Sequence, residues 1–300
     1  MSERSITLIG RELFVASLVG DGGRLGSVMH RIARQVDELA INTGEPLFRA
    51  GDRADHFFFI VSGQVSLTRP GAAATFFGER AVVGGLDAMT YRPHTHTAVA
   101  TRPALILRWG VGDWSELLED NFDLARHVIL RVAAEVQGLR LRSPPLGGFP
   151  EPALSSTARP ARLLALERLV YFQAVPLFAR AGTQALVTLS GIGSTWNAGT
   201  GNVLSRSEMV GQLVVVASGE VEASWDGCST AARFGEGALV GGGGALGTGA
   251  APNVRATGPT RAIILPLEDY FDVMEEHFDL ARSALAAIQG ERDELLDRGS

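Results

Sequence analysis

The chain has 300 residues, of which 46% are hydrophobic and 20% charged, as in proteins that fold around a core and unlike disordered chains. At roughly 150 residues per domain, this length predicts two domains. The formal net charge of −6 argues against unassisted binding to nucleic acid or to an anionic membrane surface, because both favour basic proteins. All 27 residues counted as Lys or Arg are arginines, so the lysine of phosphate-binding loops and Schiff bases is absent.

Cysteine content and hydropathy exclude further classes of protein. Cys228 is the single cysteine, which excludes an internal disulfide and a cysteine-rich metal site. No apolar run reaches the roughly 18 residues of a membrane span. The apolar segment 13–20 is flanked by Arg11, Glu12 and Asp21, so we interpret it as a helix and not as a signal peptide. We expect a cytoplasmic protein with no membrane contact.

Each half of the chain opens with a helical pattern, in which apolar residues recur at spacings of three and four. The second pattern is followed by Val175-Pro176-Leu177-Phe178. The positions that define the two helices are Leu25, Val28, Met29, Ile32 and Ala33 in the first half, and Leu163, Leu164, Leu166, Leu169 and Val170 in the second.

Short apolar stretches separated by Gly-containing turns follow each opening helix and predict β-strands. Residues 57–61 lead into Ser62-Gly63, and residues 213–216 lead into Ser218-Gly219. Because apolar alternation resumes after each Ser-Gly pair, the pattern predicts one β-hairpin in each half. Late strands are predicted at 105–107 and 263–265.

Each half closes with a predicted amphipathic helix, over 114–139 and 271–297. Its apolar residues form one stripe that is wide enough to require a partner surface. The stripe comprises Trp114, Leu118, Phe122, Ala125, Ile129, Val132, Val136 and Leu139 in the first half, and Phe271, Met274, Phe278, Ala281, Leu285 and Ile288 in the second.

The two halves repeat one another at an offset of 156 residues. Phe122-Asp123-Leu124-Ala125-Arg126 matches Phe278-Asp279-Leu280-Ala281-Arg282, and the same offset relates the Ser-Gly pairs. Such matches indicate an internal duplication. Prolines at 144, 145, 150, 152 and 160 predict a linker between the copies. The predicted organisation is a first domain at 1–140, a Pro/Gly-rich linker at 141–160 and a second domain at 161–300.

The order of a helix, Gly-punctuated strands and a closing helix resembles the cyclic nucleotide-binding domain. The resemblance rests on Gly44-Glu45-Pro46-Leu47-Phe48, on Gly51-Asp52, and on the spacing of Phe58, Ile60, Ser62-Gly63 and Val65. Val175-Pro176-Leu177-Phe178 and Ser218-Gly219 keep part of it in the second copy, where Ser207-Glu208 replaces the Gly-Asp turn. The resemblance implies a mainly β fold with flanking helices (α+β), built from two β-roll or jelly-roll domains.

The resemblance also implies a phosphate-binding cassette, in which a Gly-Glu pair begins a short helix and a later Arg faces the cyclic phosphate. Helix amides and a guanidinium suit an anionic phosphate. We call residues 83–97 the first cassette and residues 240–253 the second cassette. Gly85 stands at the Glu position and His94 at the Arg position of the first. In the second, Gly242 replaces the Glu and no Arg precedes Arg255, so both cassettes are degenerate.

The candidate ligand-binding residues follow from this alignment, and Arg92 is included because it could substitute for the missing Arg. We expect no catalytic residue, no metal and no cofactor. The candidates are Gly84, Gly85, Leu86, Asp87, Arg92, His94 and Thr95 in the first cassette, and Gly241, Gly242 and Gly243 in the second.

Two other motifs were weighed against this interpretation. Gly242, Gly244 and Gly247 match a dinucleotide fingerprint, but Gly and Pro residues follow where that motif requires a helix, so we expect a flexible turn. His94 and His96 would share one face of a strand, as in metal-binding cupins, but the next residues include no Glu.

The sequence therefore favours a non-enzymatic regulatory or scaffold protein that binds cAMP or cGMP weakly or not at all, with another protein as its partner. A sensor of a cyclic nucleotide or another small anion through the first domain is the alternative, and an enzyme with a metal in the roll is a third class. We expect no helix-turn-helix in this protein, because that motif needs two more helices after the second closing helix. The closing helices are expected to pair, either within one chain as a pseudo-dimer or in a homodimer.

Overall fold

A computed structural model describes residue 11 and residues 33–69, 73–89, 92–142, 165–226, 231–247 and 251–298. The chain divides into two compact units, and the boundary falls between Leu124 and Ala125. Most of the first predicted opening helix, the apolar segment 13–20, Cys228 and the linker from residue 143 onward lie outside the described residues. Among the described residues, no helix is both long enough and apolar enough to cross a membrane.

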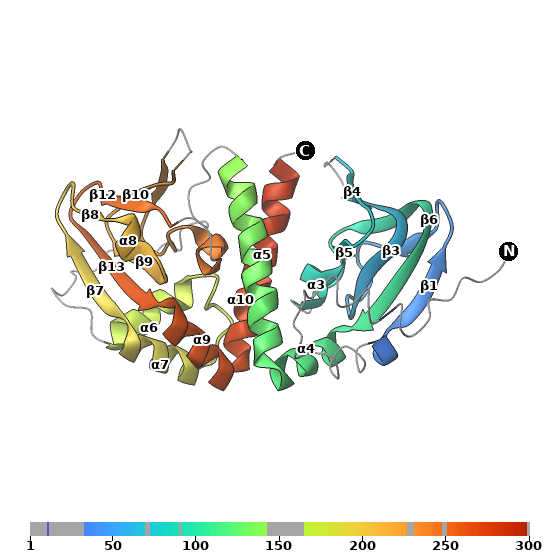
Figure 1. Cartoon of the computed structure of the whole chain (residues 1–300), viewed down its shortest axis with the longest axis horizontal. Helices are drawn as coiled ribbons and strands as arrows, with labels where there is room; N and C mark the ends of the chain where they lie inside the picture. Colours follow the sequence, from blue (N-terminus) through green and yellow to red (C-terminus); the bar gives the residue numbers. More distant parts are fainter. Residues whose placement is uncertain are drawn as a thin grey trace. The chain divides into compact units, whose positions relative to one another are not determined.

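The first unit is built on one antiparallel sheet. The order is β1-β6-β3-β4, with β2 paired to β6 and β5 paired to β3 (Figure 1). The long strands β3 and β6 pair along most of their length, and the short helix α3 follows β5. The elements are β1 (Asp37–Ile41), β2 (Pro46–Phe48), β3 (His56–Thr68), β4 (Thr75–Phe77), β5 (Val82–Val83), α3 (Gly85–Met89), β6 (Thr97–Gly110) and α4 (Val111–Asp120).

Alternating side chains of these strands build the core of the first unit. Ile60, Val65 and Ile106 are fully buried in one cluster that also includes Phe48 and Phe58. The sequence shows 57–61 and 105–107 as continuous apolar runs, which are typical of strands with a buried face. The core therefore lies directly behind β2, β3 and β5, the strands that lead into the first cassette.

The second unit contains two sheets instead of one. One has the order β11-β10-β12-β8 and the other β7-β13-β9. The elements are α5 (Phe122–Arg142), α6 (Ala165–Ala174), α7 (Thr183–Ile192), β7 (Ser194–Ala198), β8 (Val203–Leu204), α8 (Arg206–Met209), β9 (Gln212–Ser218), β10 (Val221–Ser224), β11 (Ala232–Phe234), the 3-10 helix η1 (Gly242–Leu246), β12 (Asn253–Ala256), β13 (Thr260–Pro266), α9 (Leu267–Glu276) and α10 (Phe278–Arg298). Only the first residues of α5, up to Leu124, fall in the first unit.

The predicted hairpins at the Ser-Gly pairs are wrong. Strand β3 runs straight through Gly63, with shifts of register against β6, and the chain passes from β9 to β10 at Gly219, where it changes sheets. Both glycines have a positive φ, and a Cβ would lie 2.6 Å from the Cα of Ala104 at Gly63 and 2.9 Å from that of Thr260 at Gly219. The Ser-Gly pair therefore marks a close crossing of two strands and not a turn.

Equivalent backbone hydrogen bonds occur within each of the two units, and this equivalence supports the internal duplication. Gly44 donates to the Ala100 carbonyl and Gly201 donates to the Ala256 carbonyl, both at 2.8 Å. The Arg80 amide donates to Ile60 at 2.8 Å, and the Gly237 amide donates to Val216 at 2.7 Å. Main-chain pairing at equivalent places is a property of backbone path, so the two units share one β-roll path despite their different sheet breaks.

Each predicted closing helix is two helices. The first divides between α4 and α5 at Asn121, and the second divides between α9 and α10 at His277. Both linking residues leave the helical region, with φ and ψ of −138° and 77° at Asn121 and −133° and 81° at His277. The FDLAR motif begins the second helix of each pair, so the repeated sequence marks a helix start.

Helices α5 and α10 run side by side in the second unit (Figure 1). Two ion pairs join them, Arg140 with Glu291 and Arg292 with Glu135, the latter at 3.0 Å. The Arg126 Nη2 on α5 also donates to both carboxylate oxygens of Glu268 at 2.7 Å, and its guanidinium lies over the Phe271 ring at 4.6 Å. The helix α5, which the repeat assigns to the first copy, is therefore packed as part of the second unit. It extends through Leu141 and Arg142, where the sequence predicts the start of the linker.

Candidate functional site

The first cassette begins at a glycine turn between β5 and α3. Gly84 has a φ of +78°, which favours glycine, and α3 starts at the next residue. A Cβ on Gly84 would lie 3.1 to 3.3 Å from Phe58, His94 and Phe48. The space next to the start of α3 is therefore already occupied by three rings. Gly85, at the position of the family's Glu, is the buried first residue of α3.

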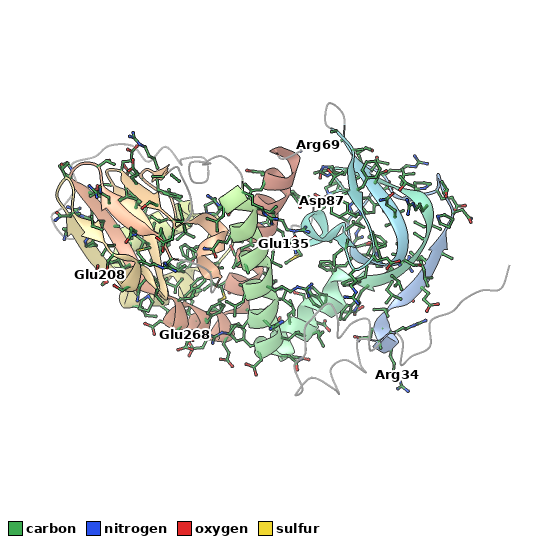
Figure 2. The ribbon with its side chains drawn as sticks, turned by 45° about the horizontal axis from the view of Figure 1, so that its top comes forward. Arg34, Arg69, Asp87, Glu135, Glu208 and Glu268 are labelled. Atoms are coloured by element: carbon green, nitrogen blue, oxygen red, sulfur yellow. The ribbon has the colours of Figure 1, made fainter. Side chains whose placement is uncertain are left out.

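Asp87 is the polar centre of this cassette, and Figure 2 labels it on α3. Its carboxylate accepts a hydrogen bond from the Thr95 amide at 2.9 Å and from the Thr95 hydroxyl at 3.1 Å. The His94 Nδ1 lies 3.6 Å from the same carboxylate, an ion-pair distance that is too long for a hydrogen bond. The carboxylate is thus held by residues of the cassette itself.

Burial alone raises the pKa of the Asp87 carboxyl, because it disfavours the charged form. The imidazole of His94 and the two groups of Thr95 outweigh burial, so the pKa of Asp87 lies below its ordinary value. The two direct hydrogen bonds from Thr95 are the firm part of this effect. Asp87 is therefore ionised at neutral pH and supplies a negative charge inside the first cassette.

His94 is buried and fixed by its neighbours. Only 3% of the residue is exposed, and its ring stacks on Phe48 with centroids 3.7 Å apart and planes 13° apart. Its backbone amide donates to the Asp52 carbonyl and its carbonyl accepts from the Gly51 amide, both at 2.8 Å. These contacts tie the cassette to the Gly-Asp turn. The Nδ1 has no hydrogen-bond partner among the described residues, and Asp87 is the charged group that it faces.

Arg92 does not join this group. It is exposed, and its backbone amide donates to the Asp87 carbonyl at 3.0 Å. The structure thus brings Gly84, Asp87, His94 and Thr95 together, with Thr95 itself exposed, and leaves the Arg92 side chain at the surface. Leu86 lies in α3, and its side chain is outside the described residues.

The second cassette starts with two left-handed glycines, Gly241 with a φ of +85° and Gly242 with a φ of +58°. They lead into η1, whose residues Gly242, Gly243, Gly244 and Leu246 are buried. The flexible turn predicted here is therefore wrong, because the segment is a buried 3-10 helix. All three predicted residues, Gly241 to Gly243, lie in it or at its cap.

A carboxylate from a distant helix fills this second cassette. The Glu291 Oε2 on α10 accepts a hydrogen bond from the Gly243 amide at 2.7 Å. Its Oε1 pairs with the Arg140 Nε on α5, and the two side chains are only 5% and 14% exposed. Neither Glu291 nor Arg140 is among the residues predicted from the sequence. The available signal was position: Glu291 continues the apolar stripe of the closing helix, between buried Ile288 and buried Leu295.

Glycine is required along η1 because two helices approach its backbone. A Cβ on Gly242 would lie 2.8 Å from the Glu291 Oε2 and would also meet the Arg140 guanidinium. A Cβ on Gly244 would lie 3.2 Å from the Gln137 Cα, and one on Gly247 would lie 3.2 Å from the Ala134 amide nitrogen. The Gly-rich run is therefore a packing surface for α5 and α10.

His94 and His96, the two histidines of the first cassette, make other contacts. Thr95 Oγ1 lies 2.9 Å from the His96 Nδ1, and His94 stacks on Phe48. Within the described ranges, no group of three or more His, Cys, Asp and Glu side chains is arranged to hold a metal ion.

Comparison with known proteins agrees with the fold of the first unit. Residues 38–121 match the family model described as the cyclic nucleotide-binding domain. This range runs from β1 to the end of α4 and contains the whole first cassette. A curated relative, a patatin-like phospholipase domain-containing protein of Caenorhabditis elegans, is 27% identical over 85 residues. The aligned part is 28% of this chain and 6% of that relative, so the chain spans a small part of its length.

Several solved structures are similar at low identity. The regulatory domain of Toxoplasma gondii PKA, crystallised with cAMP, is 13% identical with a TM-score of 0.34, over 97% of this chain and 99% of that one. The regulatory subunit of a cAMP-independent protein kinase A from Trypanosoma brucei is 15% identical with a TM-score of 0.34, over 93% and 91%. A cyclic nucleotide-binding domain from Methylobacillus flagellatus is 18% identical with a TM-score of 0.35, over 39% and 71%.

The strand order, the cassette after β5 and the family match together define the class of the first unit. The first unit has a β-roll fold of the cyclic nucleotide-binding type, and its residues 38–121 match the model of that domain. The second unit repeats its backbone path and its cassette, so the chain is a tandem of two β-roll units of this type. Figure 2 shows the side chains of both units, with Asp87 labelled on α3 of the first and Glu135 labelled on α5 of the second.

Proposed function

We propose that the chain is a non-enzymatic regulatory or scaffold protein whose two cyclic-nucleotide-binding-type units do not bind cAMP or cGMP at cellular concentrations. Its regulatory contact would be with another protein. The observation that carries this proposal is the buried His94. It stacks on Phe48 at the position where the family resemblance implies a phosphate-facing Arg.

The charges in the first cassette support the same conclusion. The Asp87 carboxylate lies 3.6 Å from the His94 imidazole, and a cyclic phosphate entering here would meet that negative charge. Arg92 is exposed and the Asp87 carboxylate is held by Thr95, so no buried guanidinium balances an incoming anion in the described part of this cassette. Loss of a buried charged contact costs roughly 2–5 kcal/mol. At 1.4 kcal/mol for each tenfold, the affinity of a micromolar site would fall about 30-fold to a few thousandfold, into the range from tens of micromolar to millimolar.

Calorimetric titration of the full chain with cAMP and with cGMP tests the proposal. We expect no saturable heat at micromolar ligand. A micromolar dissociation constant for either nucleotide would overturn the proposal, whatever the stoichiometry.

The alternative function is a sensor of a small anion through the first unit, with the exposed Arg92 as its cation. It predicts a melting shift with cyclic nucleotide that the Arg92→Ala variant loses. The matched control is Arg102→Ala, which removes another exposed arginine, on β6 and outside the cassette. If the two variants show the same melting shift with cyclic nucleotide, Arg92 is excluded as a ligand-binding residue.

A further inference from the structure

The second cassette contains a buried carboxylate that the expected nucleotide chemistry does not use. Glu291 is 4% exposed and comes from α10, 48 residues beyond Gly243. We propose that Glu291 is a built-in anion that occupies the second cassette and latches it to α5 and α10. The inference rests on the proposed function, because it explains how this cassette stays closed without a nucleotide.

Both oxygens of Glu291 have a donor. Oε2 accepts the Gly243 amide at 2.7 Å and Oε1 pairs with the Arg140 guanidinium. A backbone amide together with a guanidinium is a strong arrangement for an anion. An ionised carboxylate removed from water without such partners is very costly, so neither donor is dispensable. The carboxylate therefore links the cassette to α5 as well as to its own helix.

Glycine at position 242 makes room for the latch. A Cβ there would come within 2.8 Å of the Glu291 Oε2 and would also meet the Arg140 guanidinium. In the family resemblance this position holds a Glu that belongs to the cassette. Here the side chain is absent from the cassette, and a carboxylate from α10 reaches the vacated space. The glycine at position 242 thus leaves the space that the buried Glu291 carboxylate occupies.

The chain offers a matched control for the helix-to-helix part of this contact. Arg292 and Glu135 also join α10 to α5, at 3.0 Å, but the Glu135 side chain is 48% exposed. The atoms nearest to a Cβ on Gly242, Gly243 or Gly244 belong to Arg140, Glu291, Ile288 and Gln137. Neutralising Glu135 is therefore expected to weaken the helix pair without removing the carboxylate that contacts η1.

Amide hydrogen exchange of the full chain tests the latch. We expect Glu291→Gln to speed exchange in the segment 242–247 by at least about tenfold, because the Gly243 amide loses its charged acceptor. Glu135→Gln is expected to change the same segment by no more than about twofold. Exchange in Glu291→Gln that equals the wild type, or an equal effect of Glu135→Gln, would overturn the latch.

A second pair of variants covers the case in which Glu291→Gln unfolds the whole unit. Gly241 and Gly242 both have a positive φ, so Ala at either position introduces similar backbone strain. A Cβ on Gly241 meets only Ala245, at 3.4 Å or more. We expect Gly242→Ala to speed exchange in 242–247 about tenfold more than Gly241→Ala does. Equal effects of the two substitutions would contradict the latch.

These results are independent of the nucleotide titration. Micromolar binding of cAMP by the wild type would end the proposed function, while the exchange experiment would still report whether Glu291 holds the second cassette. Unchanged exchange in both pairs of variants, with no nucleotide binding, would end the latch and leave the proposed function in place.

Discussion

The two cassettes are closed by different means. In the first, Thr95 donates hydrogen bonds to Asp87, His94 faces the same carboxylate at 3.6 Å, and the rings of Phe48 and Phe58 pack against His94. In the second, the cassette supplies only backbone, and the charged groups come from α5 and α10. A local closure depends on one loop, whereas a long-range closure depends on how three elements pack. The conformation of the cassette therefore depends on its own loop in the first unit and on the packing of α5 and α10 in the second.

The largest expected difference between the cassettes is in stability. Removing one partner of a buried pair leaves an uncompensated charge, so Glu291→Ala is expected to destabilise the second unit by about 3–5 kcal/mol. Asp87→Ala removes the carboxylate that accepts from the neutral Thr95 donors and is expected to cost the first unit about 1–3 kcal/mol. Urea unfolding followed by hydrogen exchange of peptides from each unit measures both values. A smaller loss for Glu291→Ala than for Asp87→Ala would reverse the comparison.

The first cassette is expected to respond to acid through Asp87. The folded-state pKa of this carboxyl is lowered, so its stabilisation is present above the ordinary aspartate pKa of about 4 and is lost as the pH falls through the lower folded value. The difference in the free energy of unfolding between wild type and Asp87→Asn should therefore be constant near neutral pH and should decrease toward zero in acid. Urea unfolding at a series of pH values measures this gap.

The control for this acid response is Glu79→Gln, which neutralises an exposed carboxylate in the turn before β5. Its gap to the wild type should stay near zero across the same pH range. A gap for Asp87→Asn that persists unchanged in strong acid would show that the Asp87 charge does not stabilise the first unit.

The smallest expected effect concerns one turn that both units share. Arg80 has a φ of +67°, and the equivalent residue in the second unit is Gly237, with a φ of +80°. Because left-handed backbone is strained for residues with a side chain, Arg80→Gly is expected to stabilise the first unit by about 0.5–1 kcal/mol. Gly237→Ala should destabilise the second unit by about 1 kcal/mol. Thermal melting measures the stability of both variants. A loss of stability in Arg80→Gly would contradict the prediction that both units prefer glycine at this turn.

The sequence predicts these strands and the fold class well, because the short apolar runs at 57–61, 105–107 and 263–265 between Gly-containing turns reflect burial on a sheet. It fails at the Ser-Gly pairs, since a glycine with positive φ looks the same in a turn and at a close crossing of strands. It also fails at Asn121 and His277, because the apolar stripe keeps its period across the break and only backbone angles reveal it.

Part of the candidate site could be predicted and part could not. The first cassette is local, so aligning a short segment was enough to select Gly84, Asp87, His94 and Thr95, which the fold brings together. Arg92 was selected for its charge alone, and its exposure depends on the loop path, which composition does not encode. Glu291 and Arg140 reach the second cassette through tertiary packing, so no motif near the cassette could identify them.

The assignment of α5 to the second unit has a practical consequence for dissecting this protein. The proline-rich segment looks like the natural place to separate the copies, yet a fragment that begins after it would lack α5 and with it Arg140. Glu291 would then lie buried without its cation, and the glycines of η1 would lose Gln137 and Ala134 as neighbours. A faithful second-half fragment has to start near Ala125, inside what the repeat assigns to the first half. The boundary between the two compact units therefore lies earlier in the chain than the boundary between the two duplicated copies.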